Sequence, residues 1–203
     1  MIGIIDYGLG NLRSVLGAVE KLGFAGEISS DPATLARCDK LILPGVGAFG
    51  DGMKNLNARK LIDPLTSMIR KDRKPIFGIC LGFQLLSQGS EEFGDHAGLG
   101  WIKGRVRKIR PDDPALRVPH VGWNDFEQTR DCILFDDIPD RALFYFVHSY
   151  HLETDADTSV GTCTYGAPMT AAVQQGNVFG TQFHPEKSQR HGLKVLQNFL
   201  ERA

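Results

Sequence analysis

The chain has 203 residues, 42% of them hydrophobic and 23% charged, and no apolar run approaches the ~20 residues of a membrane span. A disordered chain and an integral membrane protein are therefore excluded. Lys and Arg number 23 against 24 Asp and Glu, a net charge of −1, so the chain as a whole does not attract nucleic acid or anionic lipid.

The pattern of the chain favours one domain over residues 1–203, because no repeat, low-complexity tract or Pro/Ser linker marks a boundary. The first six residues read as a buried strand. They have neither the basic start nor the long apolar segment of a signal peptide, which predicts a cytoplasmic protein.

The N-terminal half alternates strands with helices. A strand over residues 1–6 is followed by a glycine-rich turn and by apolar residues at helical spacing from Leu12 to Val19. Similar units begin at residues 40–43, leading into Pro44, and at residues 75–79, leading into Cys80 and an apolar helical segment. This alternation predicts a parallel sheet with helices on both faces.

From Trp101 onward the pattern changes to short strands, among them residues 143–147, 170–174 and 178–183. An amphipathic helix carrying Leu193, Leu196 and Leu200 closes the chain. The predicted fold is therefore α/β, an open and largely parallel sheet with helices on both faces plus antiparallel additions in the C-terminal half.

The segment from Gly45 to Gly50 matches the GxGxxG pattern of dinucleotide sites, but it does not follow the first strand, where that fingerprint belongs. Two other interpretations stay open. The loop is either a plain tight turn or a site where backbone N–H groups meet a developing oxyanion, since glycines allow close approach.

Cys80 lies between a predicted strand and a helix, with Gly78 and Gly82 two residues to either side. Glycines at these positions permit the sharp strand-to-helix turn that presents a nucleophile. A helix N-terminus also favours the reactive thiolate. Cys80 is therefore the candidate nucleophile; the other cysteines, which lack such flanks, are expected to be buried apolar residues: Cys38, Cys132 and Cys163.

His184 follows the strand predicted at 178–183, and Glu186 lies two residues further on, where its carboxylate could orient the imidazole. A thiolate requires such a base, so His184 is the candidate acid/base. His96 and His191 have no such setting and are expected to be solvated. The alternating Lys103, Arg105 and Arg107 predict only the solvated face of a strand.

Two further segments, 119–124 and 145–151, combine aromatic residues with histidines. Most of these residues are expected to pack in the core, and those that are exposed are expected to anchor an interface.

Together, these motifs resemble the triad-type class I glutamine amidotransferases over essentially the whole chain. The closest resemblance is to the family of glutaminase subunits of imidazole glycerol phosphate synthase. It rests on the segments DYGLGNL (6–12), PGVGAF (44–49), PHVGWN (119–124) and FHPEKS (183–188), together with FVHSY (146–150).

The resemblance implies a role for each matching residue. Cys80 would be the nucleophile, His184 the general acid/base and Glu186 its orienting group. The amides of Val46 and Leu81 would form the oxyanion site, and L-glutamine would be held by Gly47, Gln84 and the backbone of Ser149 and Tyr150. Asn11, Trp123 and Lys187 would face the partner.

The implied partner is a separate cyclase subunit, a (β/α)8 barrel, in a heterodimer. Glutamine would be hydrolysed to glutamate, and the ammonia would pass to the cyclase in histidine biosynthesis. No metal or organic cofactor is implied, and no nucleic acid or membrane partner. Three alternatives remain open at this stage: a glutaminase subunit of another synthase, a free-standing cysteine hydrolase or peptidase, and a binding module with an inactive site.

Overall fold

A parallel sheet forms the centre of the computed structural model, which describes residues 1–203. Its strands are ordered β2-β1-β3-β4-β14. In chain order they are β1 (Ile2–Ile5), β2 (Gly26–Ser29), β3 (Lys40–Gly45), β4 (Ile76–Cys80) and β14 (Val178–Thr181). All four neighbouring pairs are parallel, so the carboxyl ends of the five strands meet at one edge.

The same sheet continues beyond β14 through strands of the C-terminal half, giving 12 strands in all. The added strands pair antiparallel except for β5 with β7. They are β5 (Gly89–Ser90), β6 (His96–Ala97), β7 (Arg105–Lys108), β9 (Glu127–Gln128), β11 (Tyr150–Glu153), β12 (Ser159–Tyr165) and β13 (Ala167–Gln175).

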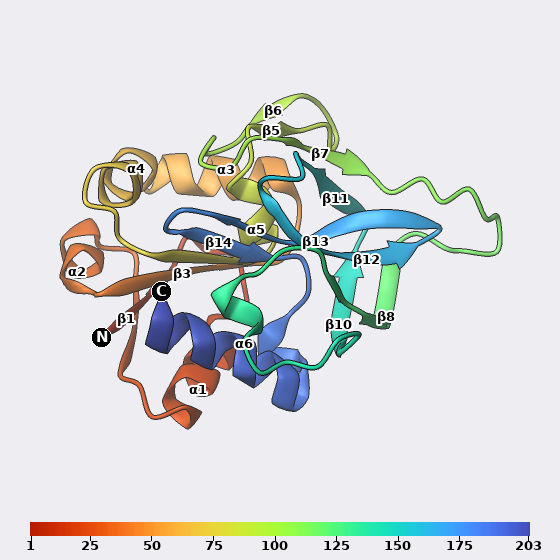
Figure 1. Ribbon diagram of the computed structural model, residues 1–203. Helices are drawn as coiled ribbons and strands as arrows, with labels where there is room; N and C mark the ends of the chain where they lie inside the picture. The colour runs from red at the N-terminus through yellow and green to blue at the C-terminus, as the bar shows by residue number, and fades with distance from the viewer.

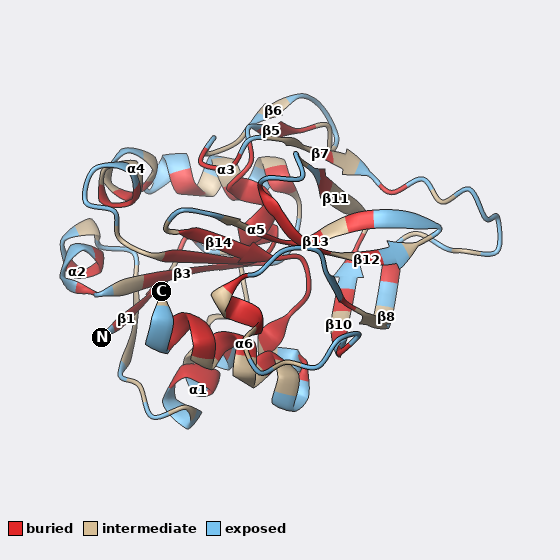
Figure 2. Ribbon diagram, in the orientation of Figure 1, coloured by how far each residue is buried: buried red, intermediate tan, exposed pale blue.

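Helices cover both faces of the parallel strands (Figure 1). Helices α1 (Leu12–Lys21) and α6 (Gln189–Arg202) lie on the lower face in that view. Above the sheet lie α3 (Phe49–Ala58) and α4 (Ile62–Arg70), with α2 (Pro32–Arg37) at the left and α5 (Leu81–Leu85) near the centre. The buried apolar side chains divide accordingly into a cluster of 28 residues and one of 23 (Figure 2).

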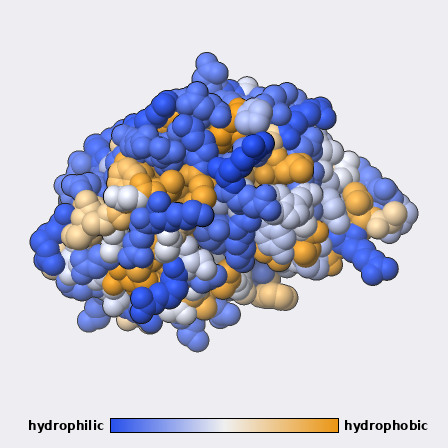
Figure 3. Space-filling view, turned by 90° about the horizontal axis from the view of Figure 1, so that it is seen from below, coloured by the Kyte–Doolittle hydropathy of each residue, from blue (hydrophilic) through white to orange (hydrophobic).

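Local sequence explains where the helices begin. Asp31 caps α2, because its carboxylate accepts the N–H groups of Ala33 and Thr34, and Pro32 supplies the preset φ of the first turn. Seen from below, the molecule shows separated hydrophobic patches among mostly hydrophilic side chains (Figure 3).

A separate two-stranded antiparallel sheet consists of β8 (His120–Asp125) and β10 (Leu143–His148). It lies at the right of Figure 1, and the 3-10 helix η1 (Ile133–Phe135) is in the connection between its strands. Its residues alternate between a buried and an exposed face, which is the pattern of a sheet packed on one side only.

The predicted fold class is confirmed, including the parallel core and the antiparallel additions. The predicted last strand is too long at its end: β14 stops at Thr181 instead of Phe183. The chain leaves the sheet there because the N–H of His184 donates to the carbonyl of Tyr145 in β10, at 3.0 Å.

One domain over residues 1–203 stays a prediction; the passage of the sheet from β4 to β14 supports it, since it unites both halves of the chain. None of the helices has the length and apolar character needed to cross a membrane.

Replacement by alanine should change the free energy of unfolding in opposite directions at two glycine positions. A Cβ at Gly82 would overlap the carbonyl oxygen of Leu43, whereas a Cβ at Gly17, inside α1, would meet nothing within 4 Å. We expect Gly82→Ala to lower the free energy of unfolding by about 3 kcal/mol or more. Gly17→Ala should raise it by about 0.5–1 kcal/mol. Urea unfolding measures both, and equal effects would contradict the packing described here.

Candidate active site

Cys80 occupies a strained turn between β4 and α5. Its backbone has φ 55° and ψ −108°, in the left-handed half of φ space that a residue with a Cβ rarely adopts. The flanking glycines are required by packing. A Cβ on Gly78 would crowd the backbone of Phe83 at 2.8 Å, and one on Gly82 would overlap Leu43. The turn predicted from the sequence is therefore present.

The thiol of Cys80 is 7% exposed and opens into a cavity of about 370 Å³. The cavity brings together eight residues that the sequence analysis singled out: Val46, Gly47, Cys80, Leu81, Gln84, Ser149, Tyr150 and His184. They come from loops after β3 and β14, from the turn after β4 and from the junction of β10 and β11. Four further residues complete the lining: Glu92, Pro119, Val147 and His148.

His184 and Glu186 form a buried pair beside this cavity. Nδ1 of His184 lies 2.8 Å from Oε1 of Glu186, and both side chains are 2% exposed. Glu186 lies on the 3-10 helix η2 (Pro185–Lys187). Because the carboxylate can only accept, Nδ1 carries the hydrogen, and the other ring nitrogen, Nε2, is buried without a hydrogen-bond partner.

Two opposing effects act on the His184 imidazole. Burial lowers its pKa, but interaction with the neighbouring Cys80 thiol and with the hydrogen-bonded Glu186 carboxylate outweighs burial and raises the pKa above its ordinary value. The site therefore favours the imidazolium form of His184.

The loop after β3 borders the cavity on a second side. Val46 is exposed and Gly47 has φ 107°. A Cβ on Gly45 would overlap the hydroxyl of Tyr7 and come within 2.8 Å of the N–H nitrogen of Gly82. Because position 45 is a glycine, this loop can lie directly against the start of α5, beside Cys80. This position differs from that of a phosphate-binding loop, which follows the first strand of its fold.

A chain of hydrogen bonds leads from β8 to this cavity. His148 lies 2.8 Å from the carbonyl of Tyr150 through Nδ1 and 2.9 Å from Nδ1 of His120 through Nε2. Nε2 of His120 lies 3.3 Å from the side-chain nitrogen of Asn124. The carbonyl can only accept, so His148 carries its hydrogen on Nδ1 and His120 donates to it. Burial lowers the pKa of His148 to about 3 and of His120 to about 4, so both are neutral at pH 7.

The sequence analysis missed the site residues His120, His148 and Gln182, and also Tyr7. The first two lie in segments that were expected mainly to pack, and they do so. Gln182 lies within the strand that the sequence predicts over residues 178–183, and nothing in the sequence sets it apart there. Only the structure shows that its amide is fully buried. Tyr7 lies in the glycine-rich turn, where nothing marks its hydroxyl as buried.

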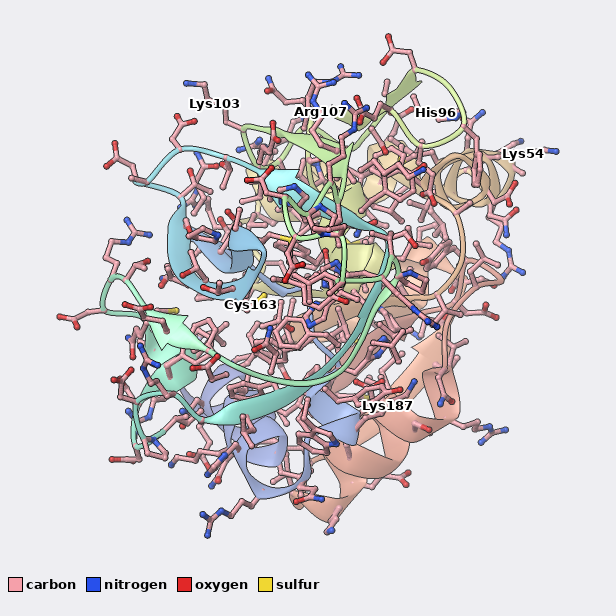
Figure 4. All side chains as sticks on the ribbon, turned by 90° about the vertical axis from the view of Figure 1, so that its right-hand side faces the viewer. Lys54, His96, Lys103, Arg107, Cys163 and Lys187 are labelled. Carbon is pink, nitrogen blue, oxygen red and sulfur yellow. The ribbon has the colours of Figure 1, made fainter.

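The expected interface residues lie at the surface. Asn11 is exposed and caps α1 by accepting the N–H of Ser14, Trp123 is on the outer face of β8, and Lys187 is exposed on η2. Figure 4 views the side of the molecule that carries β8 and β10 and labels Lys187 there, whereas Lys103 and Arg107 lie along its upper edge. Arg107 forms ion pairs with Glu91 and Glu153, as expected for a solvated strand.

The outer face of β8 and β10 carries an apolar patch of four residues, each between 37% and 55% exposed: Val121, Trp123, Leu143 and Val147. Cross-strand register places Val147 opposite Val121 and Tyr145 opposite Trp123. Val147 also lines the cavity, so the patch begins at the mouth of the site. Exposed apolar groups gathered in this way make the patch a candidate contact surface.

An α/β sheet that presents a cysteine on a strained turn beside a histidine–carboxylate pair defines the class of cysteine-dependent hydrolases. Among the known protein families, the model of "Glutamine amidotransferase class-I" matches residues 3–203. The chain belongs to this family.

Its relatives narrow the comparison. The "Imidazole glycerol phosphate synthase subunit HisH 2" of Vibrio vulnificus is 49% identical over 201 residues, covering 98% of this chain and 94% of the relative. The HisH subunit of Methanocaldococcus jannaschii is 48% identical over 204 residues and 99% of both chains.

Solved structures agree on the fold. A crystal structure of a glutamine amidotransferase superposes with a TM-score of 0.76 at 19% identity, covering 98% of this chain and 97% of the other. The structure of PurLQS from Thermotoga maritima gives 0.74 at 23% identity, covering 98% and 96%.

His120 and His148 should make the fold acid-labile. Their pKa values lie below the ~6.5 of an unfolded histidine, so from pH 6.5 to about 4 the unfolded chain binds protons that the folded chain does not. The free energy of unfolding should fall as pH falls in that window, by up to about 1.4 kcal/mol per pH unit for each residue. His184, whose pKa is raised, adds no slope in this window: the stability that it contributes is fully present below pH 6.5 and is lost only as pH rises above that value.

Urea unfolding at pH 7, 6 and 5 measures this slope. His148→Gln should be less stable at pH 7 yet lose less stability on acidification. His191→Gln, outside the chain of hydrogen bonds, should keep the wild-type slope. A variant His148→Gln with an unchanged slope would contradict the assignment of neutral, buried histidines.

Proposed function

We propose that this chain is the glutaminase subunit of an imidazole glycerol phosphate synthase. It hydrolyses L-glutamine to glutamate and ammonia, and it passes the ammonia to a cyclase subunit that makes imidazole glycerol phosphate and aminoimidazole carboxamide ribotide in histidine biosynthesis. The single observation that carries the proposal is the strained turn of Cys80 beside the His184–Glu186 pair. Relatives bearing that subunit name over the whole chain support the choice of synthase.

The chemistry proceeds in two steps. The thiolate of Cys80 attacks the side-chain carbonyl carbon of glutamine, and His184 gives a proton to the departing nitrogen as the C–N bond breaks, releasing ammonia. Water then loses a proton to His184 and attacks the thioester, and breaking of the C–S bond releases glutamate and the thiolate. Glu186 stabilises the imidazolium form of His184, and it keeps the hydrogen on Nδ1 when the ring is neutral.

The cavity supplies the remaining functions. The N–H groups of Val46 and Leu81 are our candidates for the oxyanion site, because both residues line the cavity next to Cys80. Gly47, Gln84, Ser149 and Tyr150 line the rest of it and are the candidates for holding glutamine. The assignment of these residues follows the resemblance and is supported by their shared cavity.

The apolar patch on β8 and β10 is the proposed docking surface for the cyclase, a (β/α)8 barrel. Its support is the continuity between patch and cavity through Val147, which puts ammonia release next to the partner. Trp123 supplies the aromatic anchor, and Asn11 and Lys187 supply polar contacts at the periphery. Protection from water keeps ammonia unprotonated and therefore nucleophilic.

We also place the protein in the cytoplasm. All four cysteines are free and buried, as is usual in a reducing compartment.

The test uses the complex of this chain with its cyclase. Cys80→Ala should lower glutamine-dependent product formation by at least about 10³-fold while thermal unfolding stays close to wild type, because the thiol borders a cavity and its removal only enlarges that cavity. The same complex should still make product from ammonium salt, and better as pH rises, because only neutral ammonia attacks.

Cys132→Ala is the matched control, since Cys132 is buried away from the cavity and should leave glutamine use intact. Glutamine-dependent activity that survives Cys80→Ala would remove Cys80 from the mechanism. Failure of the wild-type complex to use glutamine, although the cyclase accepts ammonium, would reject the synthase assignment.

A further inference from the structure

Gln182 is fully buried and contacts Cys80 and Gln84, two residues that line the active-site cavity. Its backbone N–H still donates to the carbonyl of Ala171 in β13, at 2.8 Å, which holds the residue at the sheet edge after β14. Its side chain lies between two groups of the site. Nε2 is 3.9 Å from Sγ of Cys80, and Oε1 is 2.9 Å from Nε2 of Gln84.

We propose that Gln182 is a positioning residue for the nucleophile: its side-chain amide donates an N–H to Sγ of Cys80, and a directional chain of hydrogen bonds from the carbonyl of Tyr150 through Gln84 enforces that orientation. The inference rests on the proposed function, in which Cys80 is the nucleophile.

The orientation follows from donor and acceptor identity. The carbonyl of Tyr150 can only accept, so the group of Gln84 that lies 2.9 Å from it is the NH2. The same nitrogen faces Gln182, which must therefore present its oxygen to Gln84. The NH2 of Gln182 is then left facing the sulfur. Turning the Gln182 amide over would set two NH2 groups against each other in a buried site.

The carbonyl of Tyr150, where this chain of hydrogen bonds begins, is itself held in place. The carbonyl of Tyr150 also accepts the Nδ1 hydrogen of His148, at 2.8 Å, so two donors hold it from different sides. Gln84, with both hydrogens of its amide used, offers bound glutamine only its oxygen, an acceptor.

The amide of Gln182 balances an opposing neighbour. The carbonyl oxygen of Val147 is also 3.9 Å from Sγ, where it accepts from a thiol and repels a thiolate. An N–H donor at the same distance favours the thiolate and holds it in place. Both contacts are long for the neutral thiol, and hydrogen bonds to an ionised acceptor shorten. Gln182 therefore acts chiefly on the reactive form.

The experiment measures the pH dependence of Cys80 alkylation by iodoacetamide, followed by mass spectrometry of the Cys80 peptide. Gln182→Met keeps the length of the side chain but removes the N–H donor, and its alkylation midpoint should move up by about one pH unit. Gln182→Glu places a carboxylate at the sulfur and should move it further. Gln175→Met, an exposed site on β13, is the control and should match wild type.

Steady-state kinetics in the cyclase complex give a second readout. Gln182→Met should lower kcat for glutamine about tenfold with less than a twofold change in KM, because the amide donates to the sulfur and Gln182 is not itself among the residues that line the cavity. Circular dichroism and thermal unfolding establish that the variant is folded; if it is not, Gln182→Glu, which retains the shape of the side chain, decides the question.

A folded Gln182→Met with the wild-type alkylation midpoint and kcat would overturn the inference, as would a Gln182→Glu with the wild-type midpoint. Failure of the proposed function has a different signature, since glutamine use would then survive Cys80→Ala. With the inference alone at fault, Cys80→Ala stays inactive with glutamine while Gln182→Met behaves as wild type.

Discussion

The backbone of Cys80 is the constraint on which the site depends. Cys80, at φ 55°, is the last residue of the central strand β4, and the first residue of α5 follows it without an intervening loop, at the edge of the cavity. The neighbours accommodate this conformation by lacking side chains. At three positions a Cβ would collide with the backbone of a neighbouring segment, and each is a glycine: Gly45, Gly78 and Gly82. The strain of such a conformation, about 1–3 kcal/mol, persists because the surrounding strands leave no alternative.

Parallel pairing explains how distant parts of the sequence meet at this turn. Gly45 pairs with Cys80, and Thr181 pairs with Ile79, so the loops after β3 and β14 leave the sheet on either side of the cysteine. The lower layer of helices and the upper layer fill the two faces, which leaves the carboxyl edge as the place where polar groups collect. The His184–Glu186 pair and the cavity lie at that edge.

The small sheet of β8 and β10 connects this edge to the molecular surface. One of its faces buries His120 and His148, whose hydrogen bonds reach Tyr150 in the cavity. Its other face exposes Trp123 and the apolar patch. A partner seated on the outer face would therefore contact the two strands whose inner histidines are hydrogen-bonded to each other and, through His148, to the backbone of Tyr150 in the cavity, which gives docking a direct physical route to the site.

The sequence was sufficient for the fold and for most of the cavity, because apolar periodicity defines the parallel strands and because glycines around Cys80 leave a local signature. It was insufficient wherever the partner of a polar group lies far along the chain. The pairing of His120 with His148 spans 28 residues and that of Gln84 with Gln182 spans 98. The end of β14 was misplaced for the same reason, since Tyr145 draws His184 away from the ladder.

The most direct test of the account is covalent labelling of the cyclase complex by an electrophilic glutamine analogue such as acivicin, with and without excess glutamine. The account predicts loss of glutamine-dependent activity with one label per chain, located on Cys80 by peptide mapping, and protection by glutamine. Inactivation with the label on Cys38, Cys132 or Cys163, or with Cys80 unmodified, would contradict it.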